Sequence, residues 1–306
     1  MIKHIKKDHI HTASVYAFAI LFAVSLSFFT KDPNDKKYGI IVDVTKQNKE
    51  EINYFFKKEA FNDLNLTSNA YVVYDVMDKK IIYSKNENTI LPLASLTKVM
   101  TAITAVSMYD KNKEIIIKGK NNYDLGLQKN QSWKLNELLK YTLIFSSNDG
   151  ADIIASNLGG ESTFVANMNK VATSLNLKMS FTNPAGLDLN GKIGGEGSAL
   201  DVAQMMSVAY KMMPDVLDTT THTRAKVLTS TGVLTGIPNT NQDVNKFIGL
   251  EASKTGFTDM AGGNLALIVD ITLGRPVVIV VLGSTKEERF KDAYKLYEAL
   301  RKSVDR

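Results

Sequence analysis

Segments that favour β-strands stand at both ends of this 306-residue chain, and the stretch between them is mostly helical. On the N-terminal side, β-rich runs at Ala70 to Met77 and Lys80 to Ser84 meet around Asp78 and Lys79, which predicts a hairpin. Three more strands are expected at Ile248 to Thr255, Asn264 to Thr272 and Val277 to Leu282. These patterns predict a fold of the mixed α/β (α+β) class, with one sheet built from distant segments and a helical insert between them.

Apolar residues recur at helical spacing in several segments of the insert and near the C-terminus. The first helix begins near Ser95 and continues to about Tyr109, with Val99, Ile103 and Val106 on one face. Further helices are expected at Leu135 to Leu143, Asp149 to Leu158, Glu161 to Leu175, Ala199 to Met212 and Lys286 to Lys302, and a short amphipathic one at Glu50 to Phe61. Loops are expected at residues 183–186 and 191–197, where Gly, Pro and Asn gather.

Missing residue types limit the chemistry that this chain can perform. It contains no cysteine, which excludes thiolate catalysis, thiolate metal sites and disulfides. Of its four histidines, only His222 lies outside the N-terminal flank, so a histidine-rich zinc centre is excluded and a serine enzyme would use lysine as its base. The net charge of +5 comes without an arginine-rich face, so we expect no nucleic-acid partner. We also expect no metal and no cofactor.

An uncharged and mainly apolar stretch, Ala13 to Phe29, follows a basic flank. One interpretation is a signal peptide cleaved after Ser27. The other is an uncleaved membrane anchor at the short limit of a span. We slightly favour the anchor, because Ser25 and Ser27 make a weaker cleavage site than an A-x-A pattern. Both interpretations place the rest of the chain outside the cytoplasm, tethered to the membrane or secreted.

A serine and a lysine stand three residues apart, in Ser95-Leu96-Thr97-Lys98, at the start of the first predicted helix. Backbone N–H groups at a helix start are free to polarise an oxyanion. Lys98 falls on the same helical face as Ser95, within reach of its hydroxyl. Burial and a second nearby cation would lower the pKa of Lys98 and make it a base. The pattern alone is weak, because it arises by chance about once in such a chain and also fits a helix cap.

Two more motifs follow in order along the chain. Ser146-Ser147-Asn148 separates two apolar helices, and Lys254-Thr255-Gly256 lies at the end of a predicted strand. Lysine and threonine offer an ammonium and a hydroxyl to a carboxylate, and Gly256 allows close approach to the backbone. Each motif alone would fit a capping turn or an edge-strand lysine. All three in order, each in its expected context, match the set found in penicillin-binding proteins and class A β-lactamases.

The residues around these motifs resemble serine-type D-Ala-D-Ala carboxypeptidases of the low-molecular-mass penicillin-binding protein family. The matching segments are residues 94–102, 146–151, 183–188, 198–203, 254–258 and 261–265. The resemblance runs from about Ala70 to the C-terminal helix. It implies the penicillin-binding/β-lactamase-like serine transpeptidase fold, an antiparallel sheet flanked by helices with a mostly helical insert. We accordingly divide the chain into residues 1–30, the signal or anchor; 31–66, a linker that includes the short helix; and 67–306, the catalytic domain.

The resemblance also implies how the acyl-enzyme would form and break down. Ser95 would attack the carbonyl of the penultimate D-alanine, with Lys98 as its base. The backbone N–H groups of Ser95 and Phe257 would form the oxyanion hole. Water would then release the shortened peptide from Ser95.

Substrate binding and leaving-group chemistry are implied for the other two motifs. Ser146 would be catalytic and, with Lys254, would relay a proton to the departing D-alanine. Asn148 would hold the substrate backbone. Lys254, Thr255 and Gly256 would line the substrate-binding strand, with Thr255 on the terminal carboxylate.

The expected partners follow from that chemistry. They are a peptidoglycan stem peptide ending in D-Ala-D-Ala, β-lactam antibiotics as covalent inhibitors, and a membrane through the N-terminal segment. The alternatives are an endopeptidase that cuts D-alanyl cross-links and a non-catalytic peptidoglycan-binding protein. A β-lactamase is disfavoured, because no Glu-x-x-Leu-Asn signature lies between the second and third motifs.

Overall fold

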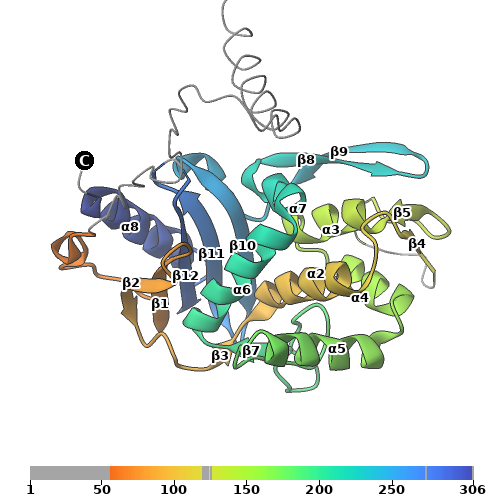
Figure 1. The fold of residues 1–306 in the computed structure, drawn as a ribbon. Coiled ribbons are helices and arrows are strands. Elements are labelled where there is room, and N and C mark those ends of the chain that lie inside the picture. The colour runs from red at the N-terminus through yellow and green to blue at the C-terminus, as the bar shows by residue number, and fades with distance from the viewer. Residues whose placement is uncertain (1–55, 119–123, 125, 273, 305–306) are drawn as a thin grey trace, which may run out of the picture. The chain divides into compact units, whose positions relative to one another are not determined.

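Strands from both ends of the chain pair into one antiparallel sheet in the computed structural model, which describes residues 56–118, 124, 126–272 and 274–304 (Figure 1). The strands are β1 (Ala70–Asp75), β2 (Lys80–Lys85), β10 (Leu250–Thr258), β11 (Gly262–Asp270) and β12 (Pro276–Ser284). Their order is β10-β11-β12-β1-β2, so the first strand pairs with the last, with Val73 opposite Ile279. The predicted sheet of distant segments is confirmed.

Both faces of this sheet are buried. Val72 and Val280 belong to an apolar cluster on one face, and Val73 and Ile279 belong to a second cluster on the other. Because neighbouring strand residues point to opposite faces, a strand covered on both sides is buried at every position, as β1 is. The covering helices are α2 (Thr97–Met108) and α6 (Ala199–Met212) on one face and α8 (Glu288–Ser303) on the other, as Figure 1 shows.

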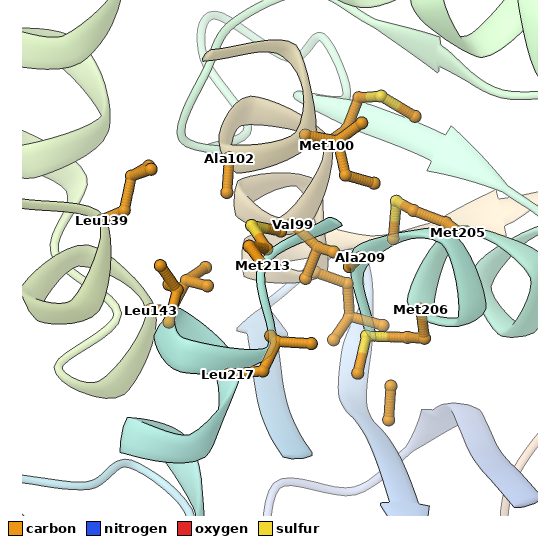
Figure 2. Close-up of a cluster of buried hydrophobic side chains, with 14 of the residues drawn as sticks. Val99, Met100, Ala102, Leu139, Leu143, Met205, Met206, Ala209, Met213 and Leu217 are labelled. Carbon is orange, nitrogen blue, oxygen red and sulfur yellow. The ribbon is translucent and has the colours of Figure 1, made fainter. Parts of the chain in front are cut away.

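The insert between β2 and β10 is mainly helical, as predicted. Besides α2 and α6 it contains η3 (Ala94–Leu96), α3 (Leu135–Ile144), α4 (Asn148–Asn157), α5 (Glu161–Ser174), α7 (Pro214–Asp218) and η4 (Thr219–Thr221). Figure 2 shows Val99 and Met100 of α2 among side chains from α3, α6 and the segment that follows α6. Val99, Met100 and Met205 are fully buried. Burial of each such side chain stabilises the fold by roughly 1.5–3 kcal/mol and holds α2 in place.

Several short strands in the insert were not predicted. They are β3 (Leu91–Pro92), β4 (Glu114–Ile116), β5 (Ser132–Lys134), β6 (Ser180–Phe181), β7 (Gly195–Gly197), β8 (Arg224–Thr229) and β9 (Gly232–Pro238). The predicted loop at 191–197 is therefore wrong over β7, which pairs with both β3 and β6. Strands of two or three residues are too short to give a periodic signal. The β8–β9 hairpin did carry one, because Ala225 and Val227 are buried between exposed neighbours.

The prediction of an amphipathic helix at Glu50 to Phe61 is wrong over its described part. Residues 56–61 contain only a short 3₁₀ helix, η2 (Lys58–Phe61). Phe56 forms a β-bridge with Val304, and the Lys57 N–H donates to the carbonyl of Ser303 at 2.9 Å. Backbone pairing with the end of α8 thus takes the place of helical bonds.

The predicted signal or anchor at 1–30 and most of the 31–66 linker lie outside the described residues. Among the helices in the described ranges, none combines the length and the apolar character needed to cross a membrane. The described residues belong to one unit, Asn53–Arg306.

Candidate active site

Ser95 lies in η3, the 3₁₀ turn that leads into α2, close to the predicted helix start. The residue before it, Ala94, has a positive φ of 49° and is 1% exposed. Non-glycine residues in this region are strained and are concentrated at functional sites. The Leu93 N–H donates to the carbonyl of Gly195 at 2.8 Å, which ties the turn to β7. This bond fixes the main chain just before Ser95.

Lys98, the second residue of α2, is fully buried, and its amine has three acceptors. The Nζ atom donates to Ser95 Oγ at 2.8 Å, to Asn148 Oδ1 at 2.7 Å and to the Ala185 carbonyl at 2.7 Å. Burial lowers the pKa of Lys98 to about 7, against the opposing charges of Asp152 and Asp124. The predicted contact between Ser95 and Lys98 is present, and a large neutral fraction of Lys98 is available near neutral pH.

The Ala185 carbonyl is held in place by the predicted loop at 183–186. Asn183 Oδ1 accepts the N–H groups of Ala185 at 3.2 Å and Gly186 at 2.7 Å, and Thr101 Oγ1 donates to Pro184 O at 2.6 Å. Gly186 has a φ of +76°, and a Cβ there would lie 2.0 Å from the carbonyl oxygen of Ala94. Only glycine lets this loop lie against the turn that carries Ser95.

The second motif joins α3 to α4, and its two serines do different things. Ser147 is the N-cap of α4, because its hydroxyl accepts the Gly150 N–H at 2.8 Å. Ser146 has a positive φ of 60°, and its hydroxyl accepts a hydrogen bond from Lys254 Nζ at 2.8 Å. Asn148 then starts α4 and reaches Lys98. The simple capping interpretation is right for Ser147 and leaves Ser146 and Asn148 for the site.

Lys254 is a second buried lysine, with 1% of its surface exposed. Besides its bond to Ser146, its Nζ atom donates to the carbonyl of Thr255 at 2.8 Å. Burial holds the pKa of Lys254 well below its usual range, and the positive charges of Lys98 and Arg289 lower it further. The site therefore contains two serine–lysine pairs, Ser95 with Lys98 and Ser146 with Lys254.

The third motif lies within β10 and not at its end, because β10 continues to Thr258. β10 is an edge strand of the sheet. A Cβ on Gly256 would lie 2.8 Å from the carbonyl oxygen of Leu93 and 3.3 Å from the Ser95 nitrogen. The sequence suggested that Gly256 makes room for a ligand. In the structure, it makes room for the turn that carries Ser95, and so brings β10 against that turn.

Arg289 and Asn264 support this arrangement, and sequence reasoning assigned neither a role. Arg289, 6% exposed on α8, donates from Nη1 to the Gly256 carbonyl at 2.6 Å. Asn264, fully buried on β11, donates from Nδ2 to the Pro92 carbonyl at 2.9 Å and accepts the Gly283 N–H at 2.9 Å. The bonds to Gly256 and to Pro92 span 33 and 172 residues of sequence, so no local pattern could reveal them.

The remaining predicted residues lie on the same strand. Thr255 is 4% exposed, and its hydroxyl donates to Thr240 Oγ1 at 2.7 Å. Phe257 keeps 41% of its surface exposed, and Lys286 Nζ lies 5.3 Å from the centre of its ring. The oxyanion hole of Ser95 and Phe257 stays a prediction. Within the described ranges, no group of three or more His, Asp and Glu residues is placed to hold a metal ion.

Comparisons with known proteins agree with this geometry. A family model for D-alanyl-D-alanine carboxypeptidases matches residues 57–286. The D-alanyl-D-alanine carboxypeptidase DacF of Bacillus subtilis is 30% identical over 230 residues, which cover 72% of this chain and 58% of that protein. A D-alanyl-D-alanine endopeptidase of Pseudomonas aeruginosa is 30% identical over 247 residues, covering 76% of each chain. The chain thus spans less than two thirds of the Bacillus protein.

Solved structures show the same fold. Penicillin-binding protein D2 from Listeria monocytogenes, in its ampicillin-bound form, is 29% identical and matches 78% of this chain and 99% of its own, with a TM-score of 0.68. The family model covers well over half of the present chain, which therefore belongs to the D-alanyl-D-alanine carboxypeptidase family. The predicted family and the predicted penicillin-binding fold are both confirmed.

Proposed function

We propose that this chain is a serine-type D-Ala-D-Ala carboxypeptidase that removes the terminal D-alanine from peptidoglycan stem peptides. The observation that carries the proposal is the buried Lys98 amine, 2.8 Å from the Ser95 hydroxyl and with a pKa of about 7. A neutral amine at this distance is a competent general base for a serine nucleophile. Family membership supplies the substrate class.

In the proposed acylation, Lys98 takes the hydroxyl proton of Ser95 as Ser95 Oγ attacks the carbonyl carbon of the penultimate D-alanine. The N–H groups of Ser95 and Phe257 stabilise the negative charge on the carbonyl oxygen. The C–N bond to the terminal D-alanine then breaks, which leaves the shortened peptide as an ester on Ser95.

The leaving D-alanine must gain a proton on its nitrogen. The Ser146 hydroxyl, bonded to Lys254 at 2.8 Å, is the proposed donor, and Lys254 restores the proton of Ser146. Asn148 and Thr255 bind the peptide backbone and the terminal carboxylate. Arg289, and Lys254 once it is protonated, favour an anionic group beside β10. Water then hydrolyses the ester.

Turnover of a defined peptide tests this proposal. An N-acylated peptide ending in D-Ala-D-Ala should release free D-alanine, and a peptide ending in L-Ala should not. Ser95→Ala should remove the activity. Ser107→Ala, which deletes an exposed hydroxyl at the far end of the same helix, should retain it.

The main alternative is an endopeptidase, the activity for which the Pseudomonas relative is named. Cross-linked substrates distinguish it from a carboxypeptidase. Cleavage of D-alanyl cross-links without release of D-alanine from the linear peptide would favour the endopeptidase function. If the folded enzyme cleaved neither substrate, the result would contradict a peptidase of either kind.

We also propose that the enzyme acts outside the cytoplasm, with residues 1–30 as a signal or anchor. The apolar stretch and the substrate class support this placement. N-terminal sequencing of membrane and soluble fractions tests the anchor, which should leave the N-terminus intact in the membrane fraction. A protein that begins at Phe28 and occurs only in the soluble fraction would contradict it.

A further inference from the structure

We propose that Thr240 is a positioning residue that aims the Thr255 hydroxyl at the terminal carboxylate of the substrate. This inference rests on the proposed carboxypeptidase function. Thr240 does not belong to any of the three sequence motifs, and it acts on the substrate only through Thr255.

Hydrogen bonds hold the segment around Thr240 beside β10. The Thr240 N–H donates to the Ile144 carbonyl at 3.1 Å. The side chain of Asn239 donates to the Thr220 carbonyl at 2.8 Å, and the hydroxyl of Ser253 on β10 donates to the same carbonyl at 2.9 Å. One carbonyl oxygen therefore fixes both the Thr240 segment and the strand that carries Thr255.

The two threonine hydroxyls form a directed chain. Thr255 Oγ1 donates to Thr240 Oγ1 at 2.7 Å, and Thr240 Oγ1 contacts the Ile144 carbonyl at 3.5 Å. A hydroxyl has a single proton, so in this arrangement the proton of Thr255 is directed at Thr240 and not at a ligand. A carboxylate can only accept, so Thr255 must turn its proton away from Thr240 when the substrate binds.

Thr240 can compensate for this change at small cost. If the Thr240 hydroxyl rotates, it donates its own proton to Thr255 Oγ1 and keeps the 2.7 Å contact. The contact it gives up, with Ile144 O, has the length of a very weak hydrogen bond. Thr255 then stays in one rotamer and donates to the carboxylate, with its oxygen still satisfied.

The position of Thr240 also links the second and third motifs. Ile144 ends α3 and lies two residues before Ser146, whereas Thr255 directly follows Lys254. Thr240 bonds to Ile144 through its backbone and to Thr255 through its side chain. The residue therefore sets where the carboxylate lies relative to the Ser146–Lys254 pair that serves the leaving group.

Two variants test whether Thr240 directs the Thr255 hydroxyl toward the carboxylate. Thr240→Val keeps the shape of the side chain and removes the hydroxyl, and Thr240→Ser keeps the hydroxyl. The measured quantity is the ratio of kcat/KM for a peptide ending in D-Ala-D-Ala as the free acid to kcat/KM for its C-terminal amide. We expect Thr240→Val to reduce this ratio roughly tenfold or more, because a hydrogen bond to a charged group loses its alignment, and Thr240→Ser to keep it.

A double variant checks that Thr240 acts through Thr255. In a Thr255→Val background, Thr240→Val should leave the ratio unchanged. An equal loss of kcat/KM on both peptides, or an unchanged ratio in Thr240→Val alone, would overturn the inference in favour of a purely structural role.

Penicillin acylation keeps the inference testable if the peptides are not turned over. The ratio of acylation rates for a penicillin and its carboxylate ester, followed by intact-protein mass spectrometry, should fall in Thr240→Val and persist in Thr240→Ser. Absence of D-alanine release from the wild type would count against the proposed function. An unchanged penicillin ratio would count against Thr240.

Discussion

Lys98 exists in both its charged and its neutral form near neutral pH, because burial lowers its pKa to about 7. As a base it must be neutral, so the reactive fraction of the enzyme should rise as the pH increases through about 7. We therefore expect the second-order rate constant for penicillin acylation to increase with pH and to level off above that value. Stopped-flow or quenched mass spectrometry on both sides of pH 7 measures it.

The same lysine provides the control for this pH profile. Arginine stays protonated throughout the range, so Lys98→Arg should acylate roughly 10²- to 10⁴-fold more slowly. A flat profile for the wild type, or near-normal acylation by a folded Lys98→Arg protein, would show that Lys98 is not the base.

Some contacts of the site follow from the sequence and others do not. The Ser95–Lys98 contact is local, because residues three apart share a helical face. The bonds from Lys98 to Asn148 and from Lys254 to Ser146 cross 50 and 108 residues, and only the family resemblance brought those residues together in advance. Thr240 is marked by no motif, because its role depends on how a hairpin end meets β10.

At the scale of elements, the close approach of β10 to the Ser95 turn decides whether the two motifs meet. In Gly256→Ala, the new Cβ would meet the Leu93 carbonyl at 2.8 Å and Ala94 Cβ at 3.3 Å, so β10 must shift. We expect a destabilisation of about 1–3 kcal/mol. Penicillin acylation should fall at least tenfold, because β10 carries Lys254 and Phe257.

A glycine without close neighbours is the matched control for that variant. Gly232, the first residue of β9, has no atom within 4 Å of a built Cβ, although its φ of +133° makes alanine strained there. Gly232→Ala should therefore lower the melting temperature and leave acylation intact. If Gly256→Ala acylated at the wild-type rate, the packing of β10 on the Ser95 turn would not control the chemistry.

Periodicity predicted the long elements well and the short ones poorly. All five strands of the main sheet and helices α2 to α6 and α8 were expected within a few residues of their observed bounds, because each of them except β2 buries several apolar side chains. The insert strands of two or three residues bury too few side chains to leave a pattern. Residues 56–61 have helix-like spacing, but the chain pairs with Val304 and Ser303 instead, a tertiary bond that overrides local preference.

At the scale of the whole molecule, Asp292 joins the segment before β1 to the opposite end of the chain. Its carboxylate, fully buried on α8, accepts the N–H groups of Thr67 and Ser68 and the hydroxyls of Thr67 and Ser284, all between 2.9 and 3.1 Å. Asp292→Ala would leave these buried donors without an acceptor, so we expect a loss of about 2–3 kcal/mol in the free energy of unfolding. Urea denaturation measures it.

Glu298→Ala on the same helix is the control for that variant. Glu298 forms an i,i+3 ion pair with Arg301 at the surface, which should contribute less than about 1 kcal/mol. Acylation by penicillin should survive in both variants at temperatures where they remain folded. Equal stabilities of the Asp292→Ala and wild-type proteins would show that the segment before β1 is not held by this carboxylate.

The central claim is that Ser95 is the nucleophile, and covalent trapping tests it most directly. A penicillin carries a reactive amide and a carboxylate like the proposed substrate, so the wild-type protein should gain the mass of one penicillin, and peptide mapping should place that mass on Ser95. Ser95→Ala should gain none, while Ser107→Ala should react as the wild type does. An adduct that persists in Ser95→Ala, or that maps to Ser146, would contradict the account.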